Sequence, residues 1–178
     1  ICDFGKKALP FELKSTDNKI ISLDDIKGEN GTLIMFICNH CPYVKAITKE
    51  IVEDCNELKK IGINSVAICS NDFINYPEDS FDNMIKFSKD NQFSFPYLQD
   101  ETQKIAKTYD AVCTPDFFGY DKDLGLQYRG RLRELKNFIP VKDGESDLLK
   151  AMKQIAETSK GPQDQIPSAG CGIKWKYD

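Results

Sequence analysis

The chain has 178 residues, of which 40% are hydrophobic and 29% are charged, and its formal net charge is −4 at pH 7. A chain of this length buries a sizeable core without disulfide staples, and its weak acidity and scattered lysines exclude the basic surface that nucleic-acid binding requires. Apolar runs stay far below the roughly 20 residues that a helix needs to cross a bilayer, so no membrane span is expected.

The seven cysteines are too sparse, and odd in number, for the disulfide framework of a small secreted scaffold. The chain begins with Ile1 rather than methionine, so its localisation stays open, with the cytoplasm slightly favoured over the periplasm. No linker rich in proline, glycine or serine divides the sequence. We expect a single domain over residues 1–178, in which residues 162–178 form a C-terminal tail that packs on it; the pattern indicates no oligomeric state.

The first half of the chain is predicted to form a hairpin, a strand, a helix and a second strand. Residues 11–13 and 19–23 flank a polar turn, which is typical of a hairpin. The continuous apolar run 32–37 indicates a central strand that is covered on both faces. Apolar residues at steps of three and four then predict a helix that ends at Gly62 and buries one stripe, namely Val44, Ile47, Ile51, Cys55 and Leu58. Residues 63–69 are predicted to form a second central strand.

The second half continues this alternation. A helix is predicted to start near Pro77, a short helix to follow Asp100, and a hairpin to join residues 116–120 and 126–129. Ser146 is expected to cap a last helix, whose apolar side is Leu148, Leu149, Met152 and Ile155. The sum is an α/β fold in which a central mixed sheet is flanked by helices. Sites in such sheets form where the carboxyl ends of the parallel strands meet.

The most informative motif, Cys38-Asn39-His40-Cys41-Pro42, stands where the strand 32–37 ends and the helix begins. The first turn of a helix offers unpaired N–H groups and a partial positive charge, and both stabilise a thiolate. We therefore expect Cys38 to be the nucleophile and Cys41 to be the thiol that resolves a mixed disulfide. Pro42 suits the first turn, whose N–H groups have no partner to lose.

The main alternative for a Cys-x-x-Cys pair is half of a zinc site. A structural zinc site needs a second Cys-x-x-Cys or a His-x-x-x-His, and the chain has neither, since His40 is its sole histidine. The redox interpretation is therefore favoured, and neither a metal nor a cofactor is predicted. Cys55 falls on the apolar stripe of the helix and is interpreted as core packing.

Several blocks of the sequence resemble the thioredoxin-fold superfamily, in the branch of alkyl hydroperoxide reductase/thiol-specific antioxidant (AhpC/TSA) proteins and bacterial thiol:disulfide oxidoreductases. The resemblance runs from Phe4 to the end of the chain and is carried by Cys-Asn-His-Cys-Pro-Tyr-Val at 38–44 and by blocks at 76–79, 95–98, 100–103, 114–118 and 170–175. It implies a thioredoxin-like fold. The implied activity is disulfide exchange with protein or low-molecular-weight thiols and with an unidentified redox partner. It further implies that Pro115 is a cis proline opposite the cysteine pair and that the backbone of Thr114 pairs with the substrate.

The resemblance also bears on the residues around the thiols. Asn39, His40 and Pro42 are expected to activate or position the pair, since a histidine at this place in similar periplasmic disulfide oxidases helps to hold the nucleophile as thiolate. An exposed histidine with little effect is an equally weighted alternative. Relatives keep a buried carboxylate near the strand before the motif, and residues 32–37 contain none. The candidates for the base that serves Cys41 are Glu12, Asp72, Asp116, His40 and water.

Two alternative functions share this fold. A peroxiredoxin would reduce peroxides through Cys38, and the resemblance then implies a motif of Pro, three residues, Thr, two residues and Cys. Counting back from Cys38 gives Met35 and Gly31. Counting back from Cys41 gives Cys38 and Ile34, so neither thiol has its threonine or proline, and efficient peroxidase activity is not expected. The second alternative is a non-catalytic module that holds a peptide in the groove at the expected cis proline.

Cys113 and Cys171 are possible auxiliary thiols. Cys113 lies two residues before Pro115, and Cys171 lies in a tail of small residues that could fold back over the site. The hypothesis is that one of them relays a disulfide to or from the pair. The alternative, which the burial statistics of cysteine favour, is an unreactive buried thiol.

Overall fold

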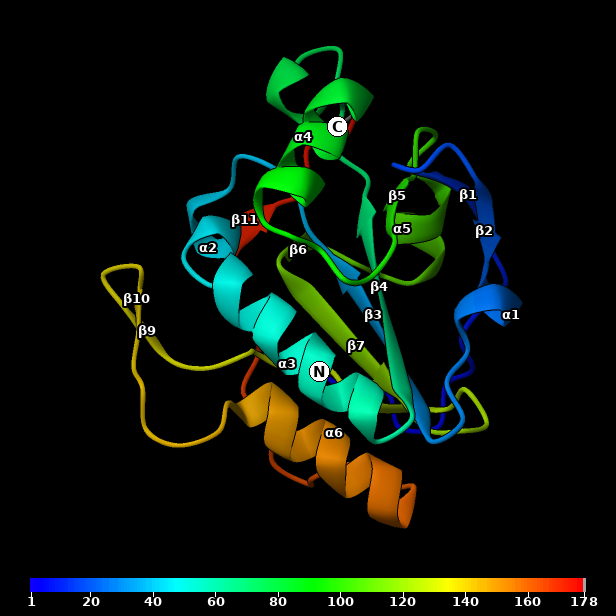
Figure 1. The fold of residues 1–178 in the computed structure, drawn as a ribbon, viewed down its shortest axis with the longest axis vertical. Helices are drawn as coiled ribbons and strands as arrows, with labels where there is room; N and C mark the ends of the chain where they lie inside the picture. Colours follow the sequence, from blue (N-terminus) through cyan, green and yellow to red (C-terminus); the bar gives the residue numbers. More distant parts are fainter. Residues whose placement is uncertain (178) are drawn as a thin grey trace.

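A mixed sheet of seven strands forms the centre of the structure, a computed structural model that describes residues 1–177 (Figure 1). The strand order is β2-β1-β5-β4-β3-β7-β8; β3, β4 and β5 run parallel, and the remaining neighbours pair antiparallel. The strands are β1 (Glu12–Ser15), β2 (Ile20–Ser22), β3 (Gly31–Phe36), β4 (Ile63–Cys69), β5 (Tyr97–Gln99), β7 (Asp116–Tyr120) and β8 (Leu126–Tyr128). The predicted α/β fold with a mixed central sheet is confirmed.

Helices cover both faces of this sheet (Figure 1). One face carries α3 (Thr48–Lys60) and α6 (Asp147–Thr158), and the other carries α1 (Leu23–Ile26) and α5 (Lys104–Thr108). Successive residues of β3 point to opposite faces, so Leu33 and Met35 pack under α3 and α6, while Ile34 and Phe36 pack toward α1 and α5. Every residue of β3 is buried, as the continuous apolar run predicts.

The helix predicted after the cysteine motif is split in two. α2 (Pro42–Lys45) is a single turn, and α3 starts after a break at Ala46 and Ile47, where the backbone of Ile47 leaves the helical region. Thr48 Oγ1 bridges the break by donating to the carbonyl of Val44 at 2.7 Å. The predicted stripe is nevertheless buried throughout, and Gly62 follows the end of α3 with a φ of +81°.

The helix expected near Pro77 begins four residues later. Pro77–Asp79 forms one 3-10 turn, and α4 (Phe81–Asp90) starts after Ser80, whose hydroxyl accepts the N–H of Asn83. Pro77 therefore opens the turn that presents Asp79, and the capping serine opens the helix. The last helix begins as predicted, because the Ser146 hydroxyl accepts the N–H of Leu149.

The rest of the chain contains short strands that the sequence did not predict. β9 (Leu135–Lys136) and β10 (Ile139–Pro140) form a small arm that projects from the body (Figure 1). A buried ion pair, with Arg133 Nη2 at 2.7 Å from Glu50 Oε2, ties the chain before this arm to α3. β11 (Cys171–Gly172) of the C-terminal tail pairs antiparallel with β6 (Cys113–Thr114).

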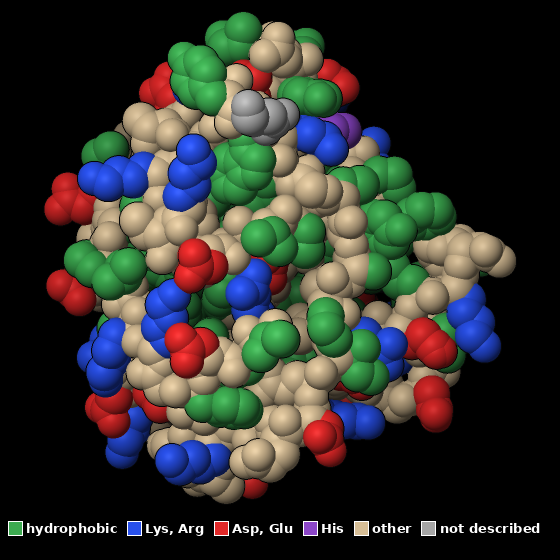
Figure 2. Space-filling view, turned by 180° about the vertical axis from the view of Figure 1, so that it is seen from behind, with side chains coloured by type: hydrophobic (Ala, Val, Ile, Leu, Met, Phe, Trp, Pro, Cys, Tyr) green, Lys and Arg blue, Asp and Glu red, His purple; other side chains and the backbone are tan. Residues whose placement is uncertain are grey.

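On the face shown in Figure 2, acidic and basic side chains are interspersed. Within residues 1–177, none of the helices combines the length and the apolar character that crossing a bilayer requires.

Candidate active site

Cys38 and Cys41 lie together just beyond the carboxyl end of β3, and each is 1% exposed. The expectation that Cys38 stands at the start of the helix is wrong. The helix begins at Pro42, so Cys41, and not Cys38, is the residue at its N-terminal cap. The N–H of Val44, in the first turn, donates to the backbone carbonyl of Cys41 at 3.0 Å, and the same N–H also helps to lower the pKa of the Cys41 thiol. Pro42 occupies the first turn, as predicted.

The interaction between the two thiols separates their acidities. It is the largest cause that lowers the pKa of Cys41 from 9.0 to about 4; Cys171 and the N–H of Val44 also lower it, and burial opposes them. The pKa of Cys38 is raised by the same interaction, by burial and by the negative charge of Asp79. The pKa of Cys41 is thus lowered while that of Cys38 is raised, which favours Cys41 as the thiolate of the pair.

Thr114 and Pro115 face these thiols. Oγ1 of Thr114 lies 3.5 Å from Sγ of Cys38, and the carbonyl oxygen of Thr114 accepts a hydrogen bond from the neutral Cys41 thiol at 3.3 Å. The Thr114–Pro115 peptide bond is cis. The structure therefore brings these two residues to the cysteine pair, where the sequence expects them.

A buried carboxylate that the sequence did not single out, Asp79, stands beside Cys38. Sγ of Cys38, a ring nitrogen of His40 and a carboxylate oxygen of Asp79 lie within 4.8 Å of one another, and Asp79 is 1% exposed. Asp79 accepts the N–H of Asn39 at 2.8 Å and the side-chain amide of Asn71 at 2.9 Å, which fixes its position. The block at 76–79 contains this residue, but its pattern is that of a helix start and carries no sign of a carboxylate at a thiol.

His40 faces Asp79. Its Nδ1 atom lies 2.7 Å from Oδ2 of Asp79 without the alignment of a hydrogen bond, so the contact is an electrostatic one when the ring is protonated. The ring stacks on Tyr76, with centroids 6.1 Å apart and planes 7° apart. With Cys38, these side chains offer three metal-binding atoms, one fewer than the four ligands of a structural zinc site.

Of the three carboxylates that the sequence offered as bases for Cys41, one is exposed and two bind other residues. Glu12 is exposed at the start of β1. Asp72 accepts hydrogen bonds from the N–H of Ile74 and the amide of Asn75. Asp116 forms an ion pair with Arg129 at 3.1 Å. Asp79 replaces them as the candidate proton acceptor, and it stands beside Cys38 rather than Cys41.

The two auxiliary thiols have different surroundings. Cys113 donates to the carbonyl of Pro115 at 3.5 Å, and burial raises its pKa to about 12. Cys171 stands directly opposite Thr114 in the pairing of β11 with β6, and its proximity helps to lower the pKa of Cys41. The tail thus folds back over the cysteine pair.

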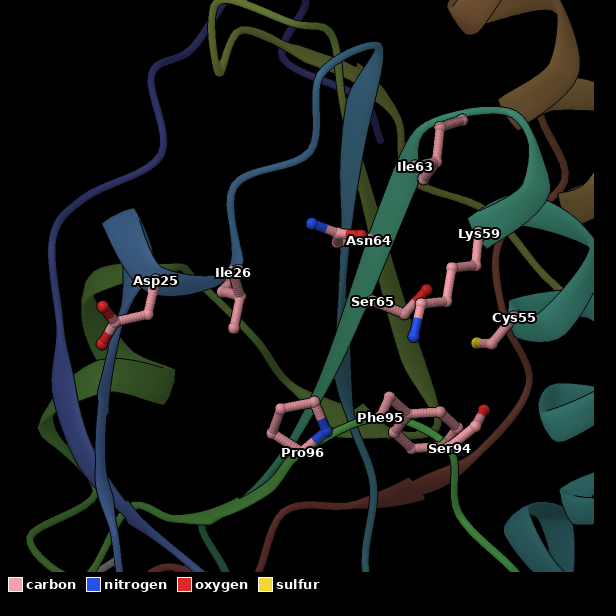
Figure 3. Close-up of a pocket in the computed structure, with 10 residues that line it drawn as sticks. All are labelled: Asp25, Ile26, Cys55, Lys59, Ile63, Asn64, Ser65, Ser94, Phe95 and Pro96. Atoms are coloured by element: carbon pink, nitrogen blue, oxygen red, sulfur yellow. The ribbon is translucent and has the colours of Figure 1, made fainter.

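Among the hollows of the described surface, one lies far from the thiols and another has Pro115, the neighbour of Thr114, in its wall. A cavity of about 210 Å³ lies at the opposite end of β4, where Cys55 and Lys59 of α3 reach toward Ser65 (Figure 3). A groove of about 520 Å³ has Pro115 in its wall, with Tyr43 and Phe138 among its apolar residues. The groove is therefore the hollow that a molecule held at the cysteine pair would meet.

The acidity of Cys41 predicts a distinctive titration. Because its pKa is lowered to about 4, the reduced protein should show the ultraviolet absorbance of one thiolate at neutral pH and lose it as the pH falls through that value. Cys38→Ser keeps a hydroxyl donor and should retain the signal, whereas Cys38→Ala removes the donor and should move the transition to higher pH. A signal that vanishes in Cys38→Ser and persists in Cys41→Ser would show that the thiolate is on Cys38.

Comparison with known proteins places these features in context. The model of the AhpC/TSA family matches residues 4–131. A search of curated proteins found no relative of this chain.

Solved structures resemble the whole chain. A crystal structure of an uncharacterised conserved protein from Geobacillus kaustophilus is 45% identical, with a TM-score of 0.93, and the match covers 100% of this chain and 95% of the other. A hypothetical protein from Sinorhizobium meliloti is 31% identical, with a TM-score of 0.91 and coverage of 100% and 97%. The thioredoxin domain of a thiol-disulfide oxidoreductase from Bacteroides vulgatus is 15% identical, with a TM-score of 0.61 and coverage of 77% and 91%. The last likeness establishes the thioredoxin-like fold.

Proposed function

The chain belongs to the AhpC/TSA family, and on that premise we propose that it is a thiol:disulfide oxidoreductase that acts through Cys41 and Cys38. One observation carries the proposal. Two buried thiols both contact Thr114, and their interaction lowers the pKa of Cys41 and raises that of Cys38. A thiolate with a protonated thiol next to it is the arrangement that attack followed by resolution requires.

The order of attack in this proposal is the reverse of the order that the sequence suggested. The Cys41 thiolate attacks one sulfur of a substrate disulfide, forms a mixed disulfide with it and releases the other sulfur as a thiolate. Cys38 then loses its proton and attacks Sγ of Cys41. The second half of the substrate leaves as a thiolate, and a Cys38–Cys41 disulfide remains. A dithiol partner must reduce that disulfide before the next cycle.

Asp79 is proposed to accept the proton of Cys38 in the resolving step. It is the buried carboxylate near Sγ of Cys38, and its charge keeps Cys38 protonated until that step by raising the pKa of the thiol. Asn39 and His40 act as positioning residues. Asn39 holds the motif to Asp79 through its N–H, and His40 places its Nδ1 atom 2.7 Å from the same carboxylate.

Peroxide reduction is the second candidate function, and the lowered pKa of Cys41 favours it. A thiolate can be oxidised to a sulfenic acid, which Cys38 is placed to convert into the same disulfide. The threonine and proline that would position the peroxide in a peroxiredoxin-like motif are absent from the sequence before both cysteines. Disulfide exchange therefore ranks first.

Insulin reduction tests the two candidates together. With dithiothreitol as the electron source, the reduced protein is expected to accelerate the precipitation of insulin chains well above the rate with dithiothreitol alone. Hydrogen peroxide consumption is expected to stay near that of a simple thiol. Rapid peroxide turnover without insulin reduction would make the protein a peroxidase. Peptide binding without either activity would make it a non-catalytic module.

A further inference from the structure

The C-terminal tail occupies the backbone edge that a substrate would use. In the pairing of β11 with β6, Cys171 is opposite Thr114, and Gly172 is opposite Cys113. Thr114 is the residue whose backbone is expected to pair with an incoming peptide in the proposed function. The tail therefore lies where a substrate strand would lie, and it carries a cysteine at the position facing the active-site sulfurs.

The approach of the tail to this edge is close on both sides of Cys171. A Cβ atom on Gly170 would lie 2.4 Å from the carbonyl oxygen of Thr114, so the backbone passes where a side chain has no room. Ser168 Oγ donates to the carbonyl of Pro115 at 2.7 Å. On the other side, Ile173 is 5% exposed and its N–H donates to the carbonyl of Val112 at 3.1 Å.

Anchors beyond β11 hold the tail in place. The N–H of Lys174 donates to Oδ1 of Asn71 at 3.0 Å, and the carbonyl of Lys174 accepts the N–H of Asp72 and the side-chain amide of Gln103, each at 2.8 Å. The N–H of Lys176 donates to Oε1 of Gln103 at 3.0 Å. Cys171 is thus fixed between anchored segments at the active site.

Cys171 stands next to the active-site sulfurs and also reaches solvent. It is paired with Thr114, whose carbonyl oxygen lies 3.3 Å from Sγ of Cys41, and its thiol is close enough to Cys41 to help lower the pKa of that residue. Cys38 and Cys41 are each 1% exposed, whereas Cys171 is partly exposed. Of the three thiols in this cluster, Cys171 is the one that a protein partner can reach without displacing the tail.

From this arrangement we propose that Cys171 is a third redox thiol, through which the buried pair exchanges electrons with an external dithiol partner. The proposal rests on the proposed function of Cys41 and Cys38. It assigns the tail the place of an internal substrate, with Cys171 as the reacting sulfur.

The relay balances without any further oxidant. The Cys171 thiolate attacks Sγ of Cys41 in the Cys38–Cys41 disulfide, so the Cys41–Cys171 bond forms and Cys38 leaves as a thiolate that takes up a proton. A partner thiolate then attacks Sγ of Cys171 and releases Cys41 as a thiolate. The second thiol of the partner displaces Cys171, which leaves the partner as a disulfide and all three cysteines reduced. Two electrons pass from the partner to the protein.

A Cys38→Ser variant isolates the new bond. When this variant is treated with one equivalent of oxidised glutathione, we expect two thiols to disappear and a peptide map to contain the Cys41–Cys171 disulfide. The control is the double variant Cys38→Ser/Cys171→Ser, in which glutathione should stay bound to Cys41. The relay is ruled out if Cys171 of the single variant remains fully alkylated by N-ethylmaleimide while glutathione accumulates on Cys41.

Turnover in the otherwise intact protein gives a second measurement. Cys171→Ser should slow the reduction of the Cys38–Cys41 disulfide by a protein dithiol about tenfold or more, and Cys2→Ser, a matched change at another partly buried cysteine, should not. An unchanged rate in Cys171→Ser would overturn the relay. A wild-type protein that forms no Cys38–Cys41 disulfide would instead contradict the proposed function itself, so the two failures are distinguishable.

Discussion

Cys41→Ser is expected to abolish disulfide exchange, lowering kcat/KM at least ~10³-fold, because it removes the attacking sulfur. Cys38→Ser should behave differently. Its Cys41 thiolate can still attack, so the variant should complete the first half of the reaction and accumulate a mixed disulfide with the substrate. Stopped-flow kinetics with a chromogenic disulfide and mass spectrometry of the adduct measure both effects.

The pair of variants also decides the order of attack. If Cys41→Ser accumulates the mixed disulfide and Cys38→Ser is inert, then Cys38 attacks and the assignment suggested by the sequence holds. Cys55→Ser is a suitable control, because Cys55 is 4% exposed and packs in the core from the inner face of α3. Its activity per folded molecule should equal that of the wild type.

Asp79→Asn is expected to slow the resolving step by about 10- to 100-fold, the range that a positioned proton acceptor contributes. The charge of Asp79 raises the pKa of Cys38, so its removal lowers that pKa and at the same time takes away the proton acceptor. Resolution in the variant then depends on solvent to ionise Cys38. Its rate should rise with pH up to the new pKa of Cys38, whereas the wild-type rate should depend less on pH. The measurement is the decay of the mixed disulfide over a range of pH.

A purely structural role for Asp79 predicts another result. Loss of its hydrogen bonds to Asn39 and Asn71 would lower the rate at every pH by the same factor. Asp72→Asn is the matched control, because Asp72 lies in the same stretch and accepts hydrogen bonds from its neighbours Ile74 and Asn75. It should leave the decay of the mixed disulfide unchanged. A flat loss in Asp79→Asn would remove the proton transfer from the mechanism.

The sequence was most informative where many residues act together. The apolar run 32–37 predicted β3, and the stripe through Val44 and Leu58 predicted a buried helical face, because burial repeats over several residues in each. The place of Cys41 was also readable. Proline is common at the first position of a helix, so Pro42 pointed to the residue before it as the cap, and that residue is Cys41.

Other parts of the site depend on contacts between distant segments. Asp79 reaches Cys38 from a turn after β4, and no periodic pattern marks a single carboxylate that the fold brings to a thiol. β6 and β11 have two residues each, too few for an alternating pattern, so the pairing of these two distant segments left no local signal. The proposal that Cys41 attacks first likewise rests on contacts that only the folded chain contains.

Three hydrogen bonds hold Asn39 in place, which limits how far the backbone can move when the protein changes between its reduced and oxidised states. The N–H of Asn39 binds Asp79, its side-chain amide donates to the carbonyl of Glu78 at 3.1 Å, and its side-chain oxygen accepts from the hydroxyl of the fully buried Tyr97 at 2.7 Å. The loop between the two sulfurs is thus braced from several directions. Formation and reduction of the disulfide should therefore leave the backbone almost unchanged. A partner would have to recognise the oxidation state by direct contact with the sulfur atoms and not by a change in molecular shape.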